Sequence, residues 1–472
     1  MNDGPVSYSF GEHAVQQAVP DPGQVRRYID TGAARAYAFR LAQLKKFRAV
    51  LIQHEEDIYN ALYTDLKKSR EEAYASELGL LLAEINGAIK HLHSWMRPKR
   101  AGTNIVNLPS SSKLYRDPLG VVLIIAPWNY PLQLLLIPLV GAIAGGNGAV
   151  LKPSELAPAT AAIIEKIITA SFSNEYVQVV QGDGATVVPA MMNAFRFDHI
   201  FYTGSIPVGK IIYLLAAKDL VPVTLELGGK SPAIVEADAD IKTAARRIVL
   251  GKFLNAGQTC IAPDYVLVHA TVKDALTAAM KTVINNFYGD DAATSYDYGK
   301  IINEKRFDKL VSYLQQGNVL SGGQYNKDSL YIAPTLLDNV SPAAPLMQDE
   351  IFGPLLPVLT FNNTADAIRI VKEHANPLAF YLFTNDTAKE QEWINNVSFG
   401  GGCINNTAWY FANHHLPFGG VGNSGMGAYH GRFTFDIFTR VKPVMKTPNW
   451  FDPAFKYPPF KGRLKLFKWF IR

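Results

Sequence analysis

Cys260 is the side chain in this sequence with the clearest capacity for covalent chemistry. It lies in the segment 255–263, Asn-Ala-Gly-Gln-Thr-Cys-Ile-Ala-Pro, whose small residues let the backbone approach a ligand closely and leave the sulfur reachable. A thiolate is a strong nucleophile, and a nearby dipole or cation would lower the pKa of the thiol. A nucleophilic role and a buried, inert role are both open for Cys260, whereas the glycine-rich segment around Cys403 favours a structural role.

Glu226 and Glu350 are candidates for acid–base chemistry. Glu226 ends a predicted strand between Leu225 and Leu227, so its carboxylate should be partly desolvated, which raises its pKa towards the range useful for a general base. Glu350 lies in the segment 349–354, Asp-Glu-Ile-Phe-Gly-Pro. For both glutamates, a structural ion pair is the alternative.

The segment 203–210, Thr-Gly-Ser-Ile-Pro-Val-Gly-Lys, joins a predicted strand to a predicted helix. Gly204 permits a tight turn, Ser205 can cap the helix, and the free N–H groups of a helix N-terminus attract phosphate. The segment is neither GxGxxG nor a P-loop, because Ile211 stands where a P-loop needs Ser or Thr after the Gly-Lys pair. On its own it is compatible with an ordinary capped turn.

Two runs of alternating strands and helices should position these groups. Short apolar segments rich in β-branched residues alternate with helical ones, which argues for parallel sheets with crossover connections. Ligands bind beyond the carboxyl ends of such strands, where the loops 126–131, 152–155, 203–209 and 226–230 converge. The predicted strands of the first run are 121–125, 149–151, 177–180, 199–202 and 223–225. Those of the second run are 233–235, 265–269, 356–359 and 380–383.

Amphipathic helices precede the first run, and extended segments flank it. Apolar residues recur at steps of three and four over 37–51 and 78–92, the spacing of a helix that buries one face. Residues 100–118 and 436–447 fit neither run and predict a small outlying sheet. The basic and aromatic segment 461–472 is too short to span a bilayer. It could contact an anionic membrane surface. The favoured hypothesis is that it docks on the protein or on a partner subunit.

The composition is that of a globular protein. The 472 residues are enough for about three domains, and 48% hydrophobic with 18% charged residues excludes a disordered chain. A formal net charge of +5 does not indicate nucleic-acid binding. Two cysteines, and ten histidines without ligand spacing, predict neither a disulfide framework nor a metal site, and they favour a reducing compartment such as the cytoplasm. No signal peptide is expected at the N-terminus, and prolines interrupt the longest apolar stretch, 121–146.

Seven segments, in order along the chain, resemble motifs of the aldehyde dehydrogenase superfamily. They are 127–131 (PWNYP), 151–155 (LKPSE), 201–210, 225–230 (LELGGK), 257–263 (GQTCIAP), 350–354 (EIFGP) and 417–420 (PFGG). The residues that follow Cys260 and the basic, aromatic C-terminus resemble the class 3, fatty-aldehyde-type branch. The resemblance implies an α/β fold with a Rossmann-variant parallel-sheet cofactor domain, an α/β catalytic domain and a small β oligomerisation extension.

The resemblance also implies domain boundaries and an assembly. The NAD-binding domain would comprise 1–99 with 119–225, and the catalytic domain 226–420. Residues 100–118 with 421–447 would form the oligomerisation segments, followed by a tail over 448–472. A homodimer is expected by analogy, because the short N-terminal region lacks the arm that tetrameric relatives use.

The implied activity is the NAD(P)-dependent oxidation of a small-molecule aldehyde to a carboxylate. The Cys260 thiolate would attack the aldehyde carbon, while the Asn129 amide and the Cys260 backbone N–H hold the oxyanion. A thiohemiacetal and then a thioester would form on Cys260, and Glu226 would activate the water that hydrolyses the thioester. The class suggests hydrophobic aldehydes, but no motif sets chain length or aromaticity.

The resemblance further implies a set of cofactor contacts. Lys152 and Glu155 would hold the adenosine ribose, and residues 204–209 would cover the pyrophosphate. Glu350 would hold the nicotinamide ribose, with Phe352 beside the ring. The full set is Trp128, Lys152, Glu155, Gly204, Ser205, Gly209, Leu227, Glu350 and Phe352. Since a carboxylate at Glu155 binds a free 2′-hydroxyl and repels a 2′-phosphate, NAD is favoured, with NADP also compatible.

Two alternatives remain. A CoA-acylating relative would resolve the thioester with CoA rather than water, but such enzymes usually lack a base at the position of Glu226. A catalytically silent structural or binding protein, kept for its fold, would not need Cys260, Glu226, Asn129 and Glu350 together. NADH formation from a medium-chain aldehyde, with and without CoA, separates the three hypotheses.

Overall fold

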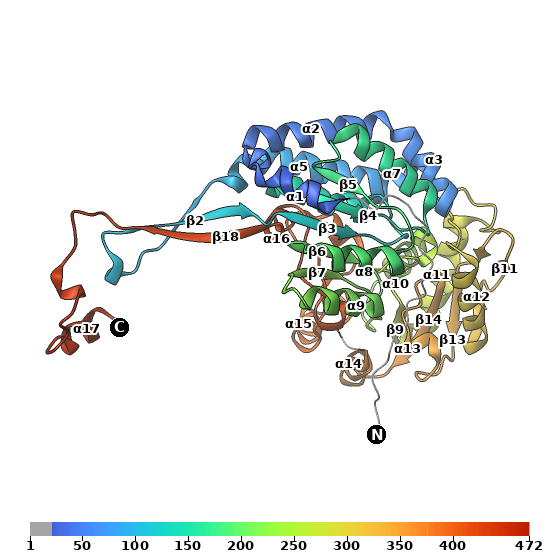
Figure 1. Cartoon of the computed structure of the whole chain (residues 1–472). Helices are drawn as coiled ribbons and strands as arrows, with labels where there is room; N and C mark the ends of the chain where they lie inside the picture. Colours follow the sequence, from blue (N-terminus) through green and yellow to red (C-terminus); the bar gives the residue numbers. More distant parts are fainter. Residues whose placement is uncertain (1–20, 375, 472) are drawn as a thin grey trace, which may run out of the picture.

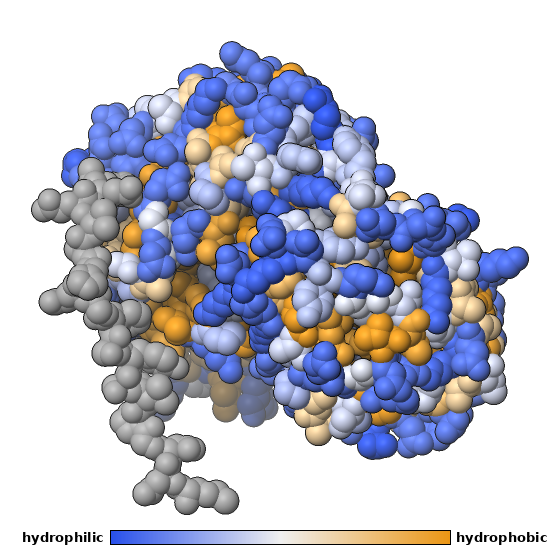
Figure 2. Space-filling model, turned by 90° about the vertical axis from the view of Figure 1, so that its right-hand side faces the viewer, coloured by the Kyte–Doolittle hydropathy of each residue, from blue (hydrophilic) through white to orange (hydrophobic). Residues whose placement is uncertain are grey.

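Two open β-sheets, each with helices packed against it, form the body of the molecule, and a narrow arm projects from this body (Figure 1). The computed structural model describes residues 21–374 and 376–471. The N-terminal residues, for which no signal peptide is expected, lie outside the described residues. None of the helices within the described ranges has the length and apolar character needed to cross a bilayer. On the face of the body seen in Figure 2, hydrophilic side chains surround separate apolar patches.

The first sheet contains the strands predicted for the first run. Its order is β17-β7-β6-β3-β4-β5, and all neighbours pair in parallel except β17 with β7. The strands are β3 (Val121–Ile125), β4 (Gly148–Lys152), β5 (Val177–Val179), β6 (His199–Thr203), β7 (Val223–Glu226) and β17 (Gly425–Met426). The helices that connect them are α6 (Gln133–Gly145), α7 (Pro158–Ser171), α8 (Gly184–Ala194) and α9 (Ile206–Ala217). The central strands β3, β4 and β6 are buried throughout, as in a parallel sheet covered on both faces.

The second sheet confirms the strands predicted for the second run and adds three others. Its order is β10-β13-β14-β9-β8-β15-β16, parallel except between β10 and β13. The strands are β8 (Pro232–Val235), β9 (Tyr265–His269), β10 (Asn318–Ser321), β13 (Thr335–Asp338), β14 (Leu355–Phe361), β15 (Ala379–Phe383) and β16 (Gly401–Ile404). The accompanying helices are α10 (Ile241–Phe253), α11 (Lys273–Tyr288), α12 (Glu304–Tyr313), α14 (Thr364–Glu373) and α15 (Thr387–Asn396).

Most of the N-terminal helices pack on the helical layer of the first sheet (Figure 1), whereas the first of them contacts the strands β3, β4 and β5 directly. They are α1 (Pro22–Asp30), α2 (Tyr37–Gln53), α3 (Glu55–Leu66), α4 (Arg70–Ala73) and α5 (Gly79–Met96). The amphipathic stripes predicted α2 and α5, and each buries its apolar residues against α6 or α7. A π-helical turn, η2 (Tyr74–Leu78), joins α4 to α5. Such turns are rare in proteins as a whole, and those that occur often lie near functional sites.

The arm is the outlying sheet that the sequence predicted. It consists of β1 (Lys99–Ala101), β2 (Ser111–Pro118) and β18 (Thr439–Lys446), all antiparallel, with β2 in the middle. Every residue of β18 except Thr439 is exposed. The tail, with η9 (Ala454–Lys456) and α17 (Leu464–Phe470), lies at the far end of the arm and away from the body (Figure 1).

Candidate active site

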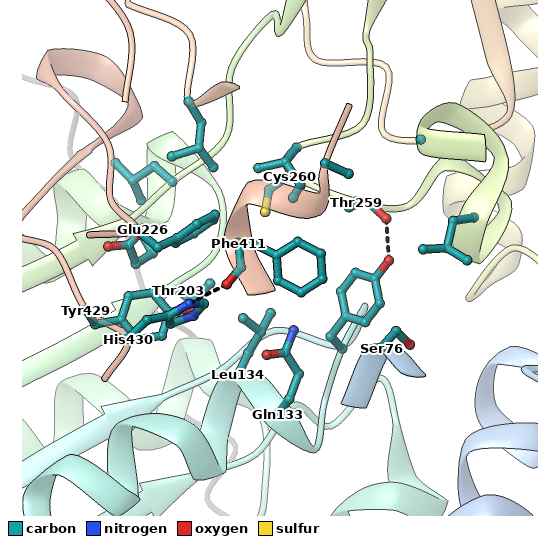
Figure 3. A pocket seen from close by; sticks show the side chains of 18 residues that line it. Ser76, Gln133, Leu134, Thr203, Glu226, Thr259, Cys260, Phe411, Tyr429 and His430 are labelled. Carbon is teal, nitrogen blue, oxygen red and sulfur yellow. Dashed lines mark hydrogen bonds between the residues drawn. The ribbon is translucent and has the colours of Figure 1, made fainter. Parts of the chain in front are cut away.

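One apolar pocket brings together Cys260, from the loop after α10, and Glu226, from the end of β7 (Figure 3). The Cys260 sulfur points into this pocket. Its wall is largely apolar and aromatic, because side chains from several distant loops meet there. They include Tyr130, Leu134, Phe411, Phe418, Tyr429 and His430.

A left-handed turn carries the chain from α10 to Cys260. Asn255, Ala256 and Gly257 all have positive φ angles, of 53°, 51° and 74°. For non-glycine residues this conformation costs roughly 1 kcal/mol or more, so surrounding contacts must hold it. A side chain at Gly257 would place Cβ 2.3 Å from the Gly353 carbonyl oxygen, which leaves room for glycine alone.

The protonation of Cys260 differs from the sequence-based expectation. The side chain is partly accessible from the pocket, yet burial raises the pKa of the thiol, and the Glu350 and Glu226 carboxyl groups add to the increase. The backbone N–H groups of Cys260 and Ile261 lower the pKa of the thiol, as expected of nearby dipoles, but burial and the two carboxyl groups outweigh them. Cys260 needs a base to react as a thiolate.

Glu226 is buried, and neither carboxylate oxygen has a hydrogen-bond partner. Burial raises the pKa of Glu226 well above its ordinary value of 4.5, as the flanking leucines predicted. Thr203, its register partner on β6, also lines the pocket, and its hydroxyl is likewise unpaired. Glu226 in its ionised form is thus a base that faces the same pocket as Cys260.

Asn129 lies against the loop that carries Cys260, although it is not part of the pocket wall. Its side-chain Nδ2 donates to the Gln258 carbonyl at 3.0 Å, and its Oδ1 has no partner. Its backbone carbonyl accepts a hydrogen bond from Asn255 Nδ2 at 2.8 Å. The structure therefore places Asn129 within the hydrogen-bond network of the cysteine loop, with one amide N–H engaged and a second available.

A second pocket adjoins the first, and Thr203 lines both. It opens at the carboxyl ends of β3, β4 and β6, where loops of a parallel sheet bind ligands. Five of the predicted cofactor residues line it: Trp128, Lys152, Glu155, Gly204 and Ser205. The Lys152 ammonium and the Glu155 carboxylate form an ion pair at 2.9 Å in its wall.

The first turn of α9 faces this second pocket. Ser205 is the N-cap residue, but its side chain makes no capping hydrogen bond. The free N–H groups at this helix N-terminus therefore form a place for an anion such as phosphate. Gly209, on the same helix, does not line either pocket; a Cβ there would lie 2.6 Å from Leu227 Cδ2. Leu227 itself lines the first pocket.

Glu350 and Phe352 approach from the second sheet. The Glu350 carboxyl lies against Gly228, where a Cβ would be 1.9 Å from Oε2. Burial raises the pKa of Glu350 to about 8, with Asp264 adding to the increase. Phe352 packs edge-on against Trp128 with ring centroids 5.4 Å apart. The structure thus brings residues of both sheets together beside the second pocket.

Sequence reasoning missed two parts of this site. The first is the aromatic wall, to which Phe411, Phe418 and Tyr429 contribute from loops without any fixed spacing. The second is a buried ion pair between Lys68 and Glu77, which contacts the Asn129 segment. No local pattern marks either, because each depends on contacts between residues far apart in the chain. Among the residues described, no group of three or more His, Cys, Asp or Glu side chains is arranged to hold a metal ion.

Comparisons with known proteins match nearly the whole chain. The model of the aldehyde dehydrogenase family matches residues 25–444. The 4,4′-diaponeurosporen-aldehyde dehydrogenase of Staphylococcus aureus is 46% identical over 449 residues, which cover 95% of this chain and 97% of that protein. Aldehyde dehydrogenase family 3 member H1 of Arabidopsis thaliana is 43% identical, over 94% of this chain and 93% of its own.

Solved structures show the same architecture. The substrate-bound state of Staphylococcus aureus AldH has a TM-score of 0.94 and 45% identity, covering 95% of this chain and 98% of that one. An indole-3-acetaldehyde dehydrogenase in complex with NAD+ has a TM-score of 0.82 and 28% identity, covering 90% of this chain and 88% of its own.

Proposed function

The chain belongs to the aldehyde dehydrogenase family. From this family membership we propose a role in aldehyde oxidation for each of its two pockets. The protein is an enzyme that oxidises aldehydes with NAD, with NADP also compatible. We propose that the aldehyde occupies the apolar pocket and that the cofactor occupies the adjoining one. The observation that carries this proposal is that Cys260 and Glu226 face one pocket, which shares Thr203 with the other.

Cys260 is the proposed nucleophile. Its sulfur would bond to the aldehyde carbon while the carbonyl oxygen becomes an oxyanion, which gives a thiohemiacetal. The backbone N–H of Cys260 and the available N–H of Asn129 would stabilise that oxyanion more strongly as its charge grows. The thiol proton must go to a base, and Glu226 is the unpaired carboxylate of the same pocket.

Glu226 would also carry the second half of the reaction. Once oxidation has produced the thioester on Cys260, water must attack the acyl carbon and lose a proton. Glu226 would accept this proton, the Cys260 sulfur would leave, and the carboxylate product would be released. Because its pKa is raised, the ionised Glu226 is a stronger base than an exposed glutamate.

The residues of the second pocket fit a dinucleotide. When bound, NAD or NADP supplies the acceptor for the hydride that leaves the substrate carbon. Lys152 and Glu155 would bind the adenosine ribose, and the uncapped N-terminus of α9 after Ser205 would bind the pyrophosphate. Glu350 would bind the nicotinamide ribose, with Phe352 and its neighbours packing against the ring.

The walls of the first pocket favour a hydrophobic aldehyde. Aromatic and aliphatic side chains supply most of the lining, whereas a polar substrate would leave its own groups unpaired there. The similar Staphylococcus aureus protein is named for 4,4′-diaponeurosporen-aldehyde. We therefore propose an apolar aldehyde, whose length the pocket alone does not set.

We further propose a homodimer formed through the arm. The strand β18 is eight residues long, lies at the edge of its sheet and is exposed, so its free backbone groups are open to pairing with another chain, although Pro443 lacks a donor. Tail residues Trp450, Leu464 and Ile471 expose large apolar side chains at the end of the arm, and a partner subunit would cover them. We place both free cysteines in a reducing compartment, the cytoplasm.

The proposed division into domains follows these sheets. The first sheet lies mainly within the NAD-binding segments, 1–99 and 119–225, and the second within 226–420. The arm strands come from the proposed oligomerisation segments, 100–118 and 421–447, with the tail after them.

Absorbance of NADH tests the reaction. The purified chain should form NADH from a medium-chain aldehyde and NAD without any need for CoA. The variant Cys260→Ala should abolish this activity, whereas Cys403→Ala, the matched control at the other free cysteine, should retain it. Activity that depends on CoA would indicate an acylating enzyme. Activity in Cys260→Ala would show that Cys260 is not the nucleophile.

A further inference from the structure

A fully buried ion pair supports the segment that precedes α6. Lys68 Nζ lies 2.5 Å from Glu77 Oε1, and neither side chain is exposed to solvent. Lys68 follows α3, while Glu77 belongs to the π-helical turn η2. Neither residue lines either pocket, so neither can touch the substrate or the cofactor there.

The remaining side-chain hydrogen bonds of this pair go to residues 129–133, and both charges also act on the buried Glu72 carboxyl. Lys68 donates to the Asn129 carbonyl at 3.0 Å, and its ammonium lies 4.0 Å from the centroid of the Tyr130 ring. Glu77 Oε2 accepts from the backbone amides of residues 132 and 133, at 2.9 and 3.3 Å. The pair therefore holds the segment at both ends, the cation at its start and the anion at its finish.

The same segment is also bonded to the cysteine loop. Asn129 Nδ2 donates to the Gln258 carbonyl at 3.0 Å, and Asn255 Nδ2 donates back to the Asn129 carbonyl at 2.8 Å. The hydroxyl groups of Tyr130 and Thr259 are 2.6 Å apart. Since Thr259 precedes Cys260, the segment 129–133 connects the ion pair to the loop that carries the nucleophile.

Stability alone does not account for such a pair. Removing two charges from water costs several kcal/mol per ion, and apolar replacements of buried pairs are often neutral or stabilising. What charge provides, and an apolar pair cannot, is a fixed direction for each hydrogen bond. We infer that Lys68 and Glu77 are positioning residues that set Asn129 and Tyr130 against the Cys260 loop and so orient the oxyanion site.

The test uses a variant that removes both charges but keeps volume. In Lys68→Met/Glu77→Gln, the glutamine oxygen can still accept from the α6 amides. The neighbouring buried Glu72, whose pKa burial already raises to about 7, loses the cation that favours its charged form and becomes neutral. The inference rests on the proposed function and predicts that kcat for aldehyde oxidation falls by about 10- to 100-fold, the range for a small misplacement of a catalytic group. The KM for NAD should stay unchanged, because the pair does not line that pocket.

A double-mutant cycle with Asn129→Ala separates positioning from a general loss of structure. If the ion pair acts through Asn129, Lys68→Met/Glu77→Gln should cost little further in the Asn129→Ala background. A loss of the same factor in both backgrounds would overturn the inference, as would a wild-type kcat in the variant. If Asn129→Ala alone leaves kcat unchanged, the proposed oxyanion role fails instead.

A second ion pair provides the matched control. Lys389 and Glu236 are 2.8 Å apart, the Glu236 side chain is buried, and neither residue lines either pocket. The variant Lys389→Met/Glu236→Gln should change thermal stability without changing kcat. An equal fall of kcat in this control would show that loss of an ion pair outside both pockets disturbs the enzyme, and the inference would fall.

Discussion

Thr203 and Glu226 are register partners at the carboxyl ends of β6 and β7, and both face the apolar pocket with no hydrogen-bond partner. A buried polar group without a partner costs about 1–3 kcal/mol. Two of them side by side are therefore a destabilising feature of the fold, retained at the point where the proposed chemistry needs a free base. As the pH rises and Glu226 ionises, we therefore expect the activity to increase and the stability of the fold to decrease.

The variant Glu226→Gln should keep the first half of the reaction and lose the second. A glutamine fits the same space but cannot accept a proton from water, so hydrolysis of the thioester should slow by about 100-fold or more. Stopped-flow measurement of NADH should show a burst followed by a slow steady state. In the wild type, the steady-state rate should rise with pH through the raised pKa of Glu226. An unchanged steady state in the variant would contradict the assigned role.

The same substitution should alter the pH dependence of stability in the other direction. The folded protein favours neutral Glu226, because burial raises its pKa above the ordinary value of 4.5. The contribution of this group to stability is complete below that ordinary value and is lost as the pH rises through the folded-state pKa. Relative to Glu226→Gln, the wild type should therefore melt at progressively lower temperature as the pH increases. Parallel melting curves for the two proteins across pH would count against a buried, neutral Glu226.

Replacement of Glu155 should change the choice of cofactor. Its carboxylate lines the second pocket beside Lys152 and would repel a 2′-phosphate. In Glu155→Gln the repulsion is gone and Lys152 is freed, so kcat/KM with NADP should rise by roughly tenfold, equivalent to about 1.4 kcal/mol. The activity with NAD should fall moderately. Steady-state kinetics with both cofactors measure this change. An unchanged ratio of kcat/KM for NADP to kcat/KM for NAD would show that Glu155 does not contact the adenosine ribose.

Deletion of residues 448–472 should weaken the assembly. If the tail covers a partner subunit, a chain that ends at residue 447 should dissociate at higher concentration than the full chain in analytical ultracentrifugation. Both chains should remain in the supernatant when mixed with anionic vesicles. Co-sedimentation of the full chain alone would instead assign the basic and aromatic tail to a membrane surface.

Much of the fold followed from local patterns. Strands such as 121–125 and 265–269 are short, apolar and bounded by turn residues, and amphipathic stripes marked the helices over 37–51 and 78–92. These signals depend on neighbours within a few positions, which is why they can be read without coordinates. The family resemblance rested on the order of its motifs, and the comparisons confirm it.

Several properties of the active site could not be predicted from local sequence patterns. The small neighbours of Cys260, and the place of Glu226 between leucines at the end of a strand, could be predicted without coordinates. The folded chain was needed to see that burial and two carboxyl groups raise the pKa of Cys260, and that Lys68 donates to the Asn129 carbonyl. Desolvation and long-range hydrogen bonds depend on residues brought together from distant segments, so no spacing along the chain encodes them.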